Sequence, residues 1–290
     1  MRNVGLGGLE LEQREKARLF REMHYAPQPL CLPNAWDVIT ARIFASVGFP
    51  AVATTSAGIA ATLGYPDGEK ISCAEMLAVV RRIANSLNIP VTADIESGYG
   101  TTLRETVDNV EQFIESGIVG INIEDSIRGV SGRQEDPLLQ AEKIAAIREL
   151  AVRLDIPLVI NARVDTLQSG VTDIEERLHE TFYRADVYRA AGADCIYVFG
   201  EHEHGLIGRL VRGISGPLNI LVGRDTPSIR ELADLGVARV SLGPGVMRAS
   251  MGLVKRVADE LIHEGTYEYL RNATMSYHEM FGYLGPARQV

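Results

Sequence analysis

The sequence has few cysteines and no long hydrophobic run. Its three cysteines, Cys31, Cys73 and Cys195, lack the spacing of a zinc site, and so sparse and odd-numbered a set favours a reducing compartment over a disulfide-stabilised secreted protein. The N-terminal segment has no apolar core of the kind found in signal peptides. No apolar run approaches the roughly 20 residues that span a bilayer. The sequence therefore predicts a cytoplasmic protein without a membrane segment.

Positive charge is also scarce. The chain has 290 residues, of which 29 are basic and 38 acidic, so the formal net charge is −9. Nucleic acids and anionic membranes are bound by basic surfaces, and the sequence therefore predicts neither as a partner. The composition is otherwise ordinary for a globular protein, with 46% hydrophobic and 23% charged residues.

Eight short, mostly apolar runs alternate with helical patterns along the chain. They predict strands at Leu30–Asn34, Ala51–Thr55, Pro90–Asp94, Gly120–Glu124, Pro157–Arg163, Asp194–Phe199, Pro217–Val222 and Arg239–Leu242. Uniformly apolar strands are typical of parallel sheets that are covered on both faces. Eight strand–helix units predict one domain, a (β/α)₈ barrel spanning residues 1–290. The alternative is a doubly wound open sheet, which rarely needs eight regular units.

Amphipathic patterns predict the helices of these units. They lie at Trp36–Val47, Ser72–Leu87, Leu103–Ser116, Leu138–Leu154 and Asp173–Ala191. Three further helices fall outside the eight units, at Leu9–Arg21, Gly245–His263 and Thr266–Gly282. A minimal barrel does not need them, and surplus terminal helices often pack on a neighbouring subunit. The sequence therefore predicts a homo-oligomer.

Carboxylates gather at the predicted ends of neighbouring strands, where barrels of this kind carry their chemistry. Asp94 and Glu96 are two positions apart and would share one face of an extended segment, and Glu124 ends the next strand. Three carboxylates in one small volume raise one another's pKa unless a cation neutralises them. An all-oxygen set suits Mg²⁺ or Mn²⁺ rather than zinc. The alternative is a set of helix caps and loop ion pairs, which is the simpler interpretation of Asp125.

Arg163 ends an apolar strand, and its side chain would point into the same end of the barrel as these carboxylates. A guanidinium there can clamp a carboxylate or phosphonate through two hydrogen bonds. The alternative is a structural pair with Asp165 or Glu124, and both interpretations can hold together. Lysine offers nothing comparable, since none of the four lysines lies in a predicted strand: Lys16, Lys70, Lys143 and Lys255. Schiff-base and pyridoxal-phosphate enzymes are therefore disfavoured, because they hold a lysine at the reacting carbon.

Five segments, in this order, resemble the isocitrate lyase/phosphoenolpyruvate mutase superfamily: TTSAG, LGYPDGE, TADIESGYG, GINIED and INARVDT. The resemblance covers about residues 20–260. It implies a (β/α)₈ barrel whose eighth helix is swapped between partners, usually in a dimer of dimers. It also implies that the protein binds Mg²⁺ and a small oxo acid. Members of the superfamily cleave or form a C–C or P–C bond next to an enolate of the pyruvate type.

The resemblance assigns a role to each residue that matches a family motif. Asp94 would be the principal metal ligand, and the ion would also be held, directly or through water, by Asp67, Glu96 and Glu124. The substrate carboxylate would be bound by Thr54, Thr55, Ser56 and Arg163. Glu201 matches an acidic residue that lies near the distal part of the substrate in the lyases. The expected catalytic residues are therefore Arg163, Glu124 and Glu201.

The loop after Asp125 departs from the family pattern. It reads Ser126-Ile-Arg-Gly-Val-Ser-Gly-Arg-Gln, whereas the lyases carry Lys-Arg-Cys-Gly-His, whose cysteine is the catalytic acid or base. Isocitrate or methylisocitrate lyase activity is therefore not expected. The lysine and asparagine of the mutases and phosphonopyruvate hydrolases are missing as well. Glu96 stands where a second aspartate is commoner, a change still compatible with metal binding.

These observations predict a Mg²⁺-dependent lyase or decarboxylase acting on a small α-oxo or 2-hydroxy carboxylate through a metal-stabilised enolate. Arg128 or Arg133 would close over the site from the loop after Asp125. One alternative is a phosphonate mutase or hydrolase with the same metal site. The other is an oxo-acid binding protein without catalytic activity.

Overall fold

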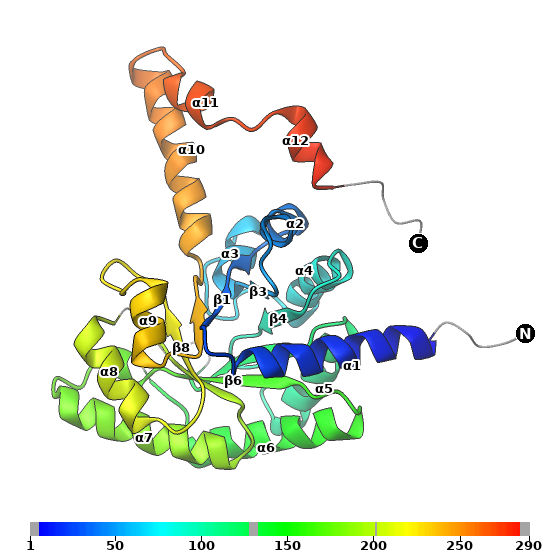
Figure 1. Cartoon of the computed structure of the whole chain (residues 1–290), viewed down its shortest axis with the longest axis vertical. Helices are drawn as coiled ribbons and strands as arrows, with labels where there is room; N and C mark the ends of the chain where they lie inside the picture. Colours follow the sequence, from blue (N-terminus) through cyan, green and yellow to red (C-terminus); the bar gives the residue numbers. More distant parts are fainter. Residues whose placement is uncertain (1–5, 128–132, 201, 285–290) are drawn as a thin grey trace, which may run out of the picture.

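Nine parallel strands form a single sheet that is rolled into a nearly closed barrel (Figure 1). The computed structural model describes residues 6–127, 133–200 and 202–284. The strands are β1 (Leu30–Leu32), β2 (Asn34–Ala35), β3 (Val52–Thr54), β4 (Val91–Asp94), β5 (Gly120–Glu124), β6 (Val159–Val164), β7 (Cys195–Val198), β8 (Leu218–Leu221) and β9 (Arg239–Ser241). They are hydrogen-bonded in the order β1-β9-β8-β7-β6-β5-β4-β3-β2. The predicted α/β barrel is confirmed.

The first predicted strand, Leu30–Asn34, is divided in two at Pro33. β1 pairs with β9 and β2 pairs with β3, so the two ends of the sheet are consecutive pieces of chain. Pro33 accepts a hydrogen bond from Ala53 N at 2.9 Å but has no N–H of its own to donate to a neighbour. The ninth strand therefore arises from this break, and the barrel retains eight strand positions.

Helices cover the sheet and continue beyond it at the C-terminus. They are α1 (Leu6–Met23), α2 (Val38–Val47), α3 (Ser56–Thr62), α4 (Cys73–Asn85), α5 (Leu103–Glu115), α6 (Pro137–Arg153), α7 (Ile174–Ala190), α8 (His204–Gly213), α9 (Ile229–Leu235), α10 (Gly245–His263), α11 (Glu268–Ala273) and α12 (Tyr277–Gly282), with a 3₁₀ turn η1 (Thr166–Gln168). Helices α3, α8 and α9, with 7, 10 and 7 residues, lie outside the helix ranges named from the sequence.

Helix α1 packs across the N-terminal end of the barrel. Phe20 is completely buried, and a Cβ atom at Gly120 would lie 2.8 Å from its ring, which explains a glycine at the start of β5. Gln13 Nε2 donates to the carbonyl oxygens of Ile114 and Ile118, both at 2.8 Å. Since α1 covers this end, the carboxyl ends of the strands form the open mouth.

The C-terminal helices leave the barrel, as Figure 1 shows for α10 and the segment beyond it. The prediction of one helix over Thr266–Gly282 is wrong, because the structure has α11 and α12 instead. The chain becomes extended at Thr274, and α12 starts anew where Ser276 Oγ accepts a hydrogen bond from Glu279 N at 3.2 Å. A side-chain cap of this kind defines the first turn of a new helix.

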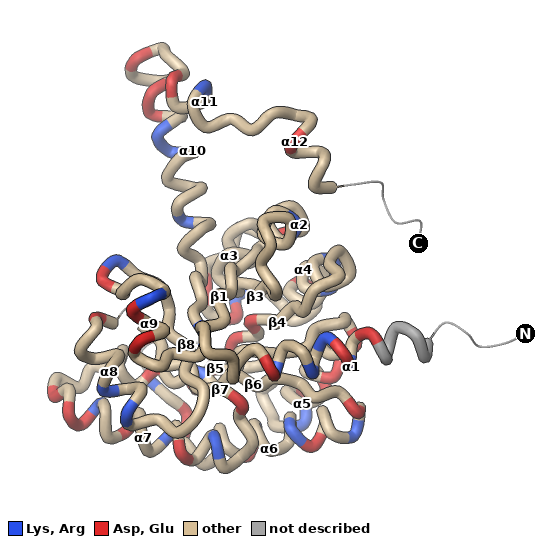
Figure 2. The backbone as a smooth tube through the Cα atoms, viewed as in Figure 1, with Lys and Arg blue, Asp and Glu red and all other residues tan. Residues whose placement is uncertain are grey.

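Acidic and basic residues are interspersed along the outer helices in the view of Figure 2. Among the described residues, no helix combines the length and the apolar character that a membrane span requires.

Candidate functional site

The strand register brings the predicted site residues together at the mouth of the barrel. Asp94 on β4 is paired with Asn122 on β5, and Glu124 on β5 is paired with Arg163 on β6. Arg163 is in turn paired with Tyr197 on β7. Side chains that are in register on parallel neighbours point to the same face of the sheet. The prediction that Asp94, Glu124 and Arg163 face one volume is therefore supported by the topology.

Asp94 is held by the segment that follows β3. Its Oδ2 accepts hydrogen bonds from Ser56 N at 3.0 Å and Ser56 Oγ at 2.8 Å, and its own N donates to Thr54 Oγ1 at 3.0 Å. Thr55 caps α3 by accepting from Gly58 N at 3.3 Å. Thr54 and Ser56, two of the four predicted carboxylate-binding residues, thus orient Asp94. The described residues donate no hydrogen bond to Asp94 Oδ1, which leaves that oxygen available to a cation.

Asp67 reaches the same volume from the segment between α3 and α4. Its Oδ1 lies 3.5 Å from Ser56 Oγ. Burial and the negative charge of Asp94 raise the pKa of Asp67 above its ordinary value, while Arg163 opposes the shift. Since the charge of Asp94 contributes to this shift, the two carboxylates share a region that a cation would stabilise.

Glu96 lies close to these carboxylates, but for a different reason from the one expected. Strand β4 ends at Asp94, and Glu96 has a left-handed φ of 52°, so the two residues are not on one face of an extended segment. Instead, Glu96 O accepts a hydrogen bond from Glu124 N at 2.9 Å, which places it beside β5. Burial chiefly, with repulsion from Asp67 and Asp94, raises the pKa of Glu96 to about 7.

Arg163 makes both of the contacts that sequence reasoning offered as alternatives to substrate binding. Nη1 lies 2.6 Å from Glu124 Oε2, while Nε and Nη2 bond Asp165 Oδ1 and Oδ2 at 2.6 and 2.7 Å. The guanidinium also stacks on the Phe199 ring, 3.6 Å from its centroid. Burial raises the pKa of Glu124, and Arg163 opposes that shift. The arginine is therefore fixed in orientation at the mouth.

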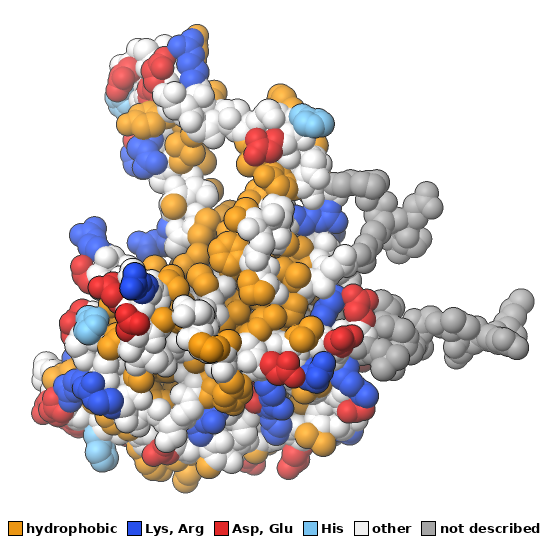
Figure 3. All heavy atoms as spheres, in the orientation of Figure 1, with side chains coloured by type: hydrophobic (Ala, Val, Ile, Leu, Met, Phe, Trp, Pro, Cys, Tyr) orange, Lys and Arg blue, Asp and Glu red, His pale blue; other side chains and the backbone are white. Residues whose placement is uncertain are grey.

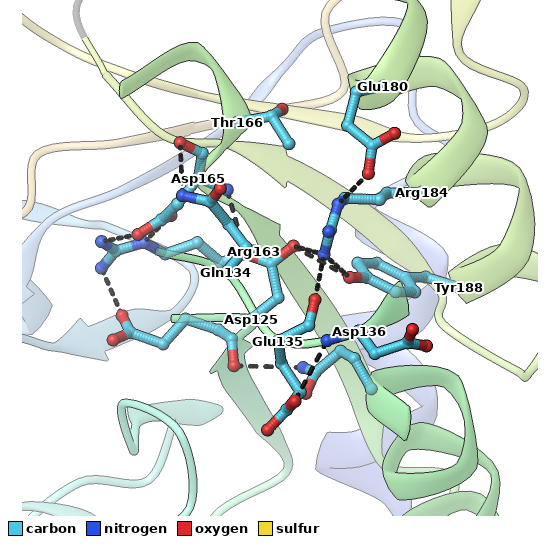
Figure 4. Close-up of polar contacts among 12 residues, drawn as sticks. Asp125, Gln134, Glu135, Asp136, Arg163, Asp165, Thr166, Glu180, Arg184 and Tyr188 are labelled. Carbon is cyan, nitrogen blue, oxygen red and sulfur yellow. Dashed lines mark hydrogen bonds and ion pairs between the residues drawn. The ribbon is translucent and has the colours of Figure 1, made fainter. Parts of the chain in front are cut away.

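Asp125 belongs to a structural ion pair with Arg184 of the outer helix α7 (Figure 4), as its simpler interpretation predicted. Its Oδ2 accepts from Arg184 Nη1 at 3.0 Å and from Tyr188 OH at 2.8 Å, and its Oδ1 accepts from Asp165 N at 3.1 Å. The Asp125 side chain is completely buried. Sequence reasoning missed Arg184 and Tyr188, although their spacing of four residues places them on one face of α7.

The residues of the mouth fit a magnesium ion that keeps much of its water. Among the described residues, no group of three His, Cys, Asp or Glu side chains is close enough together to bind a metal directly. Mg²⁺ usually retains several waters and contacts one or two carboxylates. Asp94 with its available Oδ1 suits direct contact, and Asp67, Glu96 and Glu124 suit contact through water. The donors are all oxygens, as this ion prefers.

Some predicted residues cannot be placed. Glu201 and Arg128 lie outside the described residues. Arg133 is exposed at the base of the loop after β5. There, Ile127 N donates to Arg133 O at 3.0 Å, and Ser126 and Gln134 form an isolated antiparallel bridge. The two ends of this loop are therefore held side by side next to Glu124.

Comparisons with known proteins agree with this architecture. Residues 20–262 match the family model for phosphoenolpyruvate phosphomutase. An uncharacterised protein of Mycobacterium tuberculosis (strain CDC 1551 / Oshkosh) is 36% identical over 227 residues, which are 77% of this chain and 81% of that protein. The oxaloacetate decarboxylase of Pseudomonas fluorescens (strain SBW25) is 30% identical over 242 residues, 81% of this chain and 80% of the enzyme.

A solved structure from Burkholderia cenocepacia J2315, provisionally described as a phosphonomutase, is also similar. It superimposes with a TM-score of 0.80 at 38% identity, and the match covers 84% of this chain and 99% of the other. The matched region of the family model includes every strand of the barrel and all the carboxylates at its mouth. The chain therefore belongs to the isocitrate lyase/phosphoenolpyruvate mutase superfamily of enzymes.

Proposed function

We propose that the protein is a Mg²⁺- or Mn²⁺-dependent lyase or decarboxylase that acts on a small α-oxo or 2-hydroxy carboxylate. The observation that carries this proposal is the position of Asp94. Ser56 fixes one of its oxygens, and the described residues donate no hydrogen bond to the other. Burial, together with the charge of Asp94, raises the pKa of Asp67, Glu96 and Glu124. A bound divalent cation would supply the positive charge that stabilises an enolate as it develops.

Arg163 is the residue of this chain best placed to bind the substrate carboxylate. Glu124 and Asp165 hold its guanidinium from two sides, and Phe199 holds it from a third. The side chain therefore loses little conformational entropy when a substrate binds. Thr54, Thr55 and Ser56 line the same mouth from β3 and the start of α3. Glu201, from the segment after β7, is proposed to approach the distal part of the substrate.

The relatives favour cleavage next to an oxo acid. One of them is an oxaloacetate decarboxylase. In such a decarboxylation a C–C bond breaks and carbon dioxide leaves. The electron pair of that bond remains as an enolate, which is then protonated. The loop after β5 lacks the cysteine of the isocitrate lyases, so a reaction that needs that acid is not proposed. The similarity to the Burkholderia protein supports a second candidate, a phosphonate mutase or hydrolase.

A substrate panel with and without metal tests the proposal. We expect oxaloacetate or a malate-type acid to release pyruvate or a related oxo acid only when Mg²⁺ or Mn²⁺ is present, as followed by coupled reduction of the product. Turnover of phosphonopyruvate alone, seen by ³¹P NMR, would favour the second candidate. Calorimetric binding of oxalate, an enolate mimic, without turnover of any member of the panel would contradict both and indicate a binding protein.

We further propose a homo-oligomer, a dimer of dimers in which α10 packs on a partner subunit. On α10, Val254 follows Met251 by three residues, and Leu261 and Ile262 follow Val254 by seven and eight. These four side chains are 49% (Met251), 59% (Val254), 50% (Leu261) and 79% (Ile262) exposed. Figure 3 shows hydrophobic side chains gathered on the barrel beneath α10. An apolar hollow of about 390 Å³, lined in part by Leu30, Val47 and Phe49, lies on the barrel surface as well. Such surfaces are rarely left in water.

Ile262→Glu is expected to dissociate this assembly in part. Loss of the isoleucine side chain would remove roughly 2 kcal/mol of hydrophobic stabilisation at each interface. Burial of the glutamate charge would add a desolvation cost to this loss. Sedimentation velocity would show a shift from tetramer to smaller species. Arg256→Gln is the matched control, since Arg256 is an exposed residue on the other side of α10 from Ile262. A wild-type protein that sediments as a monomer at micromolar concentration would contradict the proposal.

A further inference from the structure

Glu69 is a buried acid to which neither the sequence analysis nor the proposed mechanism gives a role. It follows Asp67 by two residues and is only 5% exposed. Its Oε1 accepts three hydrogen bonds from the segment after β4, from Ser97 N at 3.0 Å, Ser97 Oγ at 2.6 Å and Tyr99 N at 3.0 Å. A single carboxylate thus joins the segment that carries Asp67 to the segment that carries Glu96.

The Glu96 carboxylate in turn accepts hydrogen bonds from Glu69 and Tyr99. Glu69 N donates to Glu96 Oε2, and Tyr99 OH donates to Glu96 Oε1 at 2.8 Å. Lys143 on α6 donates from Nζ to Ser97 O at 3.3 Å, which ties the same segment to a neighbouring helix. We call Glu69, Glu96, Ser97 and Tyr99 the Glu69 cluster. Each of its four members is at most 8% exposed, so water cannot easily replace these hydrogen bonds.

The backbone of the Glu69 cluster is strained. Four non-glycine residues in the described part of the chain have a left-handed φ, and three of them belong to the cluster: Glu69 at 53°, Glu96 at 52° and Tyr99 at 59°. Such conformations are unfavourable for residues with a side chain and persist where surrounding contacts over-determine them. Hydrogen bonds to the carboxylates of Glu69 and Glu96 link the three strained residues to one another. Strained segments of this kind are concentrated at functional sites.

We propose that Glu69 is a positioning residue for the metal site. Its carboxylate holds the Asp67 and Glu96 segments together, so that both acids face Asp94 before the cation arrives. The inference rests on the proposed function, because it assigns Glu69 to the same cation site. Residues that orient metal ligands without touching the metal commonly control its affinity. The Oε1 of Glu69 is engaged by Ser97 and Tyr99, so this oxygen orients the neighbouring segment.

Variants at Glu69 test this role when compared with a matched control. Glu69→Ala removes the acceptor, and Glu69→Gln keeps an uncharged acceptor in the same place. The control is Glu105→Gln, because Glu105 Oε2 accepts from Thr101 N at 2.8 Å and from Thr101 Oγ1 at 2.6 Å in the same connection after β4, but is exposed and makes no described link to the Asp67 segment. Glu105 therefore stabilises that connection without joining it to the Asp67 segment.

Mn²⁺ binding, measured by electron paramagnetic resonance, is the primary readout. We expect Glu69→Ala to weaken Mn²⁺ affinity by about 10-fold or more, Glu69→Gln by less, and Glu105→Gln hardly at all. In turnover assays the concentration of Mg²⁺ needed for half-maximal rate should rise, while kcat at saturating metal stays closer to that of the wild type. A purely structural role would lower the melting temperature and leave metal affinity in the folded protein unchanged.

Amide hydrogen exchange of the metal-free protein gives a second readout that does not depend on metal. Glu69→Ala should accelerate exchange in residues 64–72 and 95–101 together, whereas Glu105→Gln should affect only the second segment. If Glu69→Ala fails to fold, Glu69→Gln carries both measurements. An affinity for Mn²⁺ within about twofold of the wild type in the Glu69 variants would overturn the positioning role.

Mn²⁺ binding by the wild type and by Asp94→Asn distinguishes a failure of the proposed function from a failure of the positioning role. If the wild-type protein binds no Mn²⁺, the metal site itself is wrong, and the positioning role falls with it. If the wild type binds Mn²⁺ and Asp94→Asn does not, while the Glu69 variants bind as the wild type does, the metal site stands and only the role of Glu69 is overturned.

Discussion

Asp94→Asn is expected to lower metal-dependent turnover by about 10³-fold, because a cation that stabilises developing charge is worth several kcal/mol and roughly 4 kcal/mol corresponds to that factor. The substitution preserves the size of the side chain, and asparagine can still accept the hydrogen bonds from Ser56 N and Oγ. It removes the negative charge at the only oxygen of this residue that the described residues leave without a hydrogen bond. The loss should therefore fall on metal binding rather than on folding.

Turnover as a function of Mg²⁺ concentration, together with Mn²⁺ binding by paramagnetic resonance, checks this expectation. Asp108→Asn is the control, since Asp108 is an exposed carboxylate on α5 that pairs only loosely with Arg104 at 3.7 Å. It should behave as the wild type in both assays. A variant at Asp94 that keeps its metal dependence and most of its activity would contradict the assignment of this residue as the principal ligand.

The position of the site was predictable because of the regularity of a parallel barrel. Strand ends meet at one mouth, so residues that end neighbouring strands come together whatever lies between them. Asp94, Glu124 and Arg163 follow this rule, and their registers agree with it. The fold was predictable for the same reason, since the apolar strands are the part of the sequence with the clearest pattern.

Prediction failed where the chain leaves regular structure. The shared face of Asp94 and Glu96 assumed an extended segment, but the left-handed φ of Glu96 is incompatible with one. Glu69 was overlooked because no periodic pattern indicates which loop residue is buried. Its partners Ser97 and Tyr99 are 28 and 30 positions away along the chain. Contacts of this range are created by the folding of two loops against each other, which a single sequence does not encode in its local pattern.

The ion pair of Asp125 illustrates the same limit in regular structure. Both partners lie in well-predicted elements or beside them, yet the pair joins positions 59 residues apart. Arg184 is on the buried face of α7, and helical periodicity alone marks that face as apolar rather than charged. A buried arginine in such a place is explained only by the carboxylate it meets.

Arg184→Leu is expected to destabilise the protein by about 3–5 kcal/mol at neutral pH, because it leaves the completely buried Asp125 carboxylate without its cation. Urea unfolding followed by circular dichroism would measure the change. Arg209→Leu is the matched control. Arg209 pairs with Glu175 at 2.6 Å, but the two side chains are 39% and 67% exposed. Removal of such a surface pair should cost no more than about 1 kcal/mol.

The dependence of this loss on pH identifies its cause. Burial raises the pKa of Asp125 from 3.8 to about 6 in the folded protein, even though Arg184 and Tyr188 favour the charged form. The folded state therefore binds the proton more tightly than the unfolded state, and the contribution of Asp125 to stability falls as the pH rises through this window. Without Arg184 the folded pKa rises further, so the variant should lose most stability at pH 8 and regain part of it near pH 5. A loss that is independent of pH, or that grows on acidification, would mean that lost packing rather than an unpaired charge destabilises the variant.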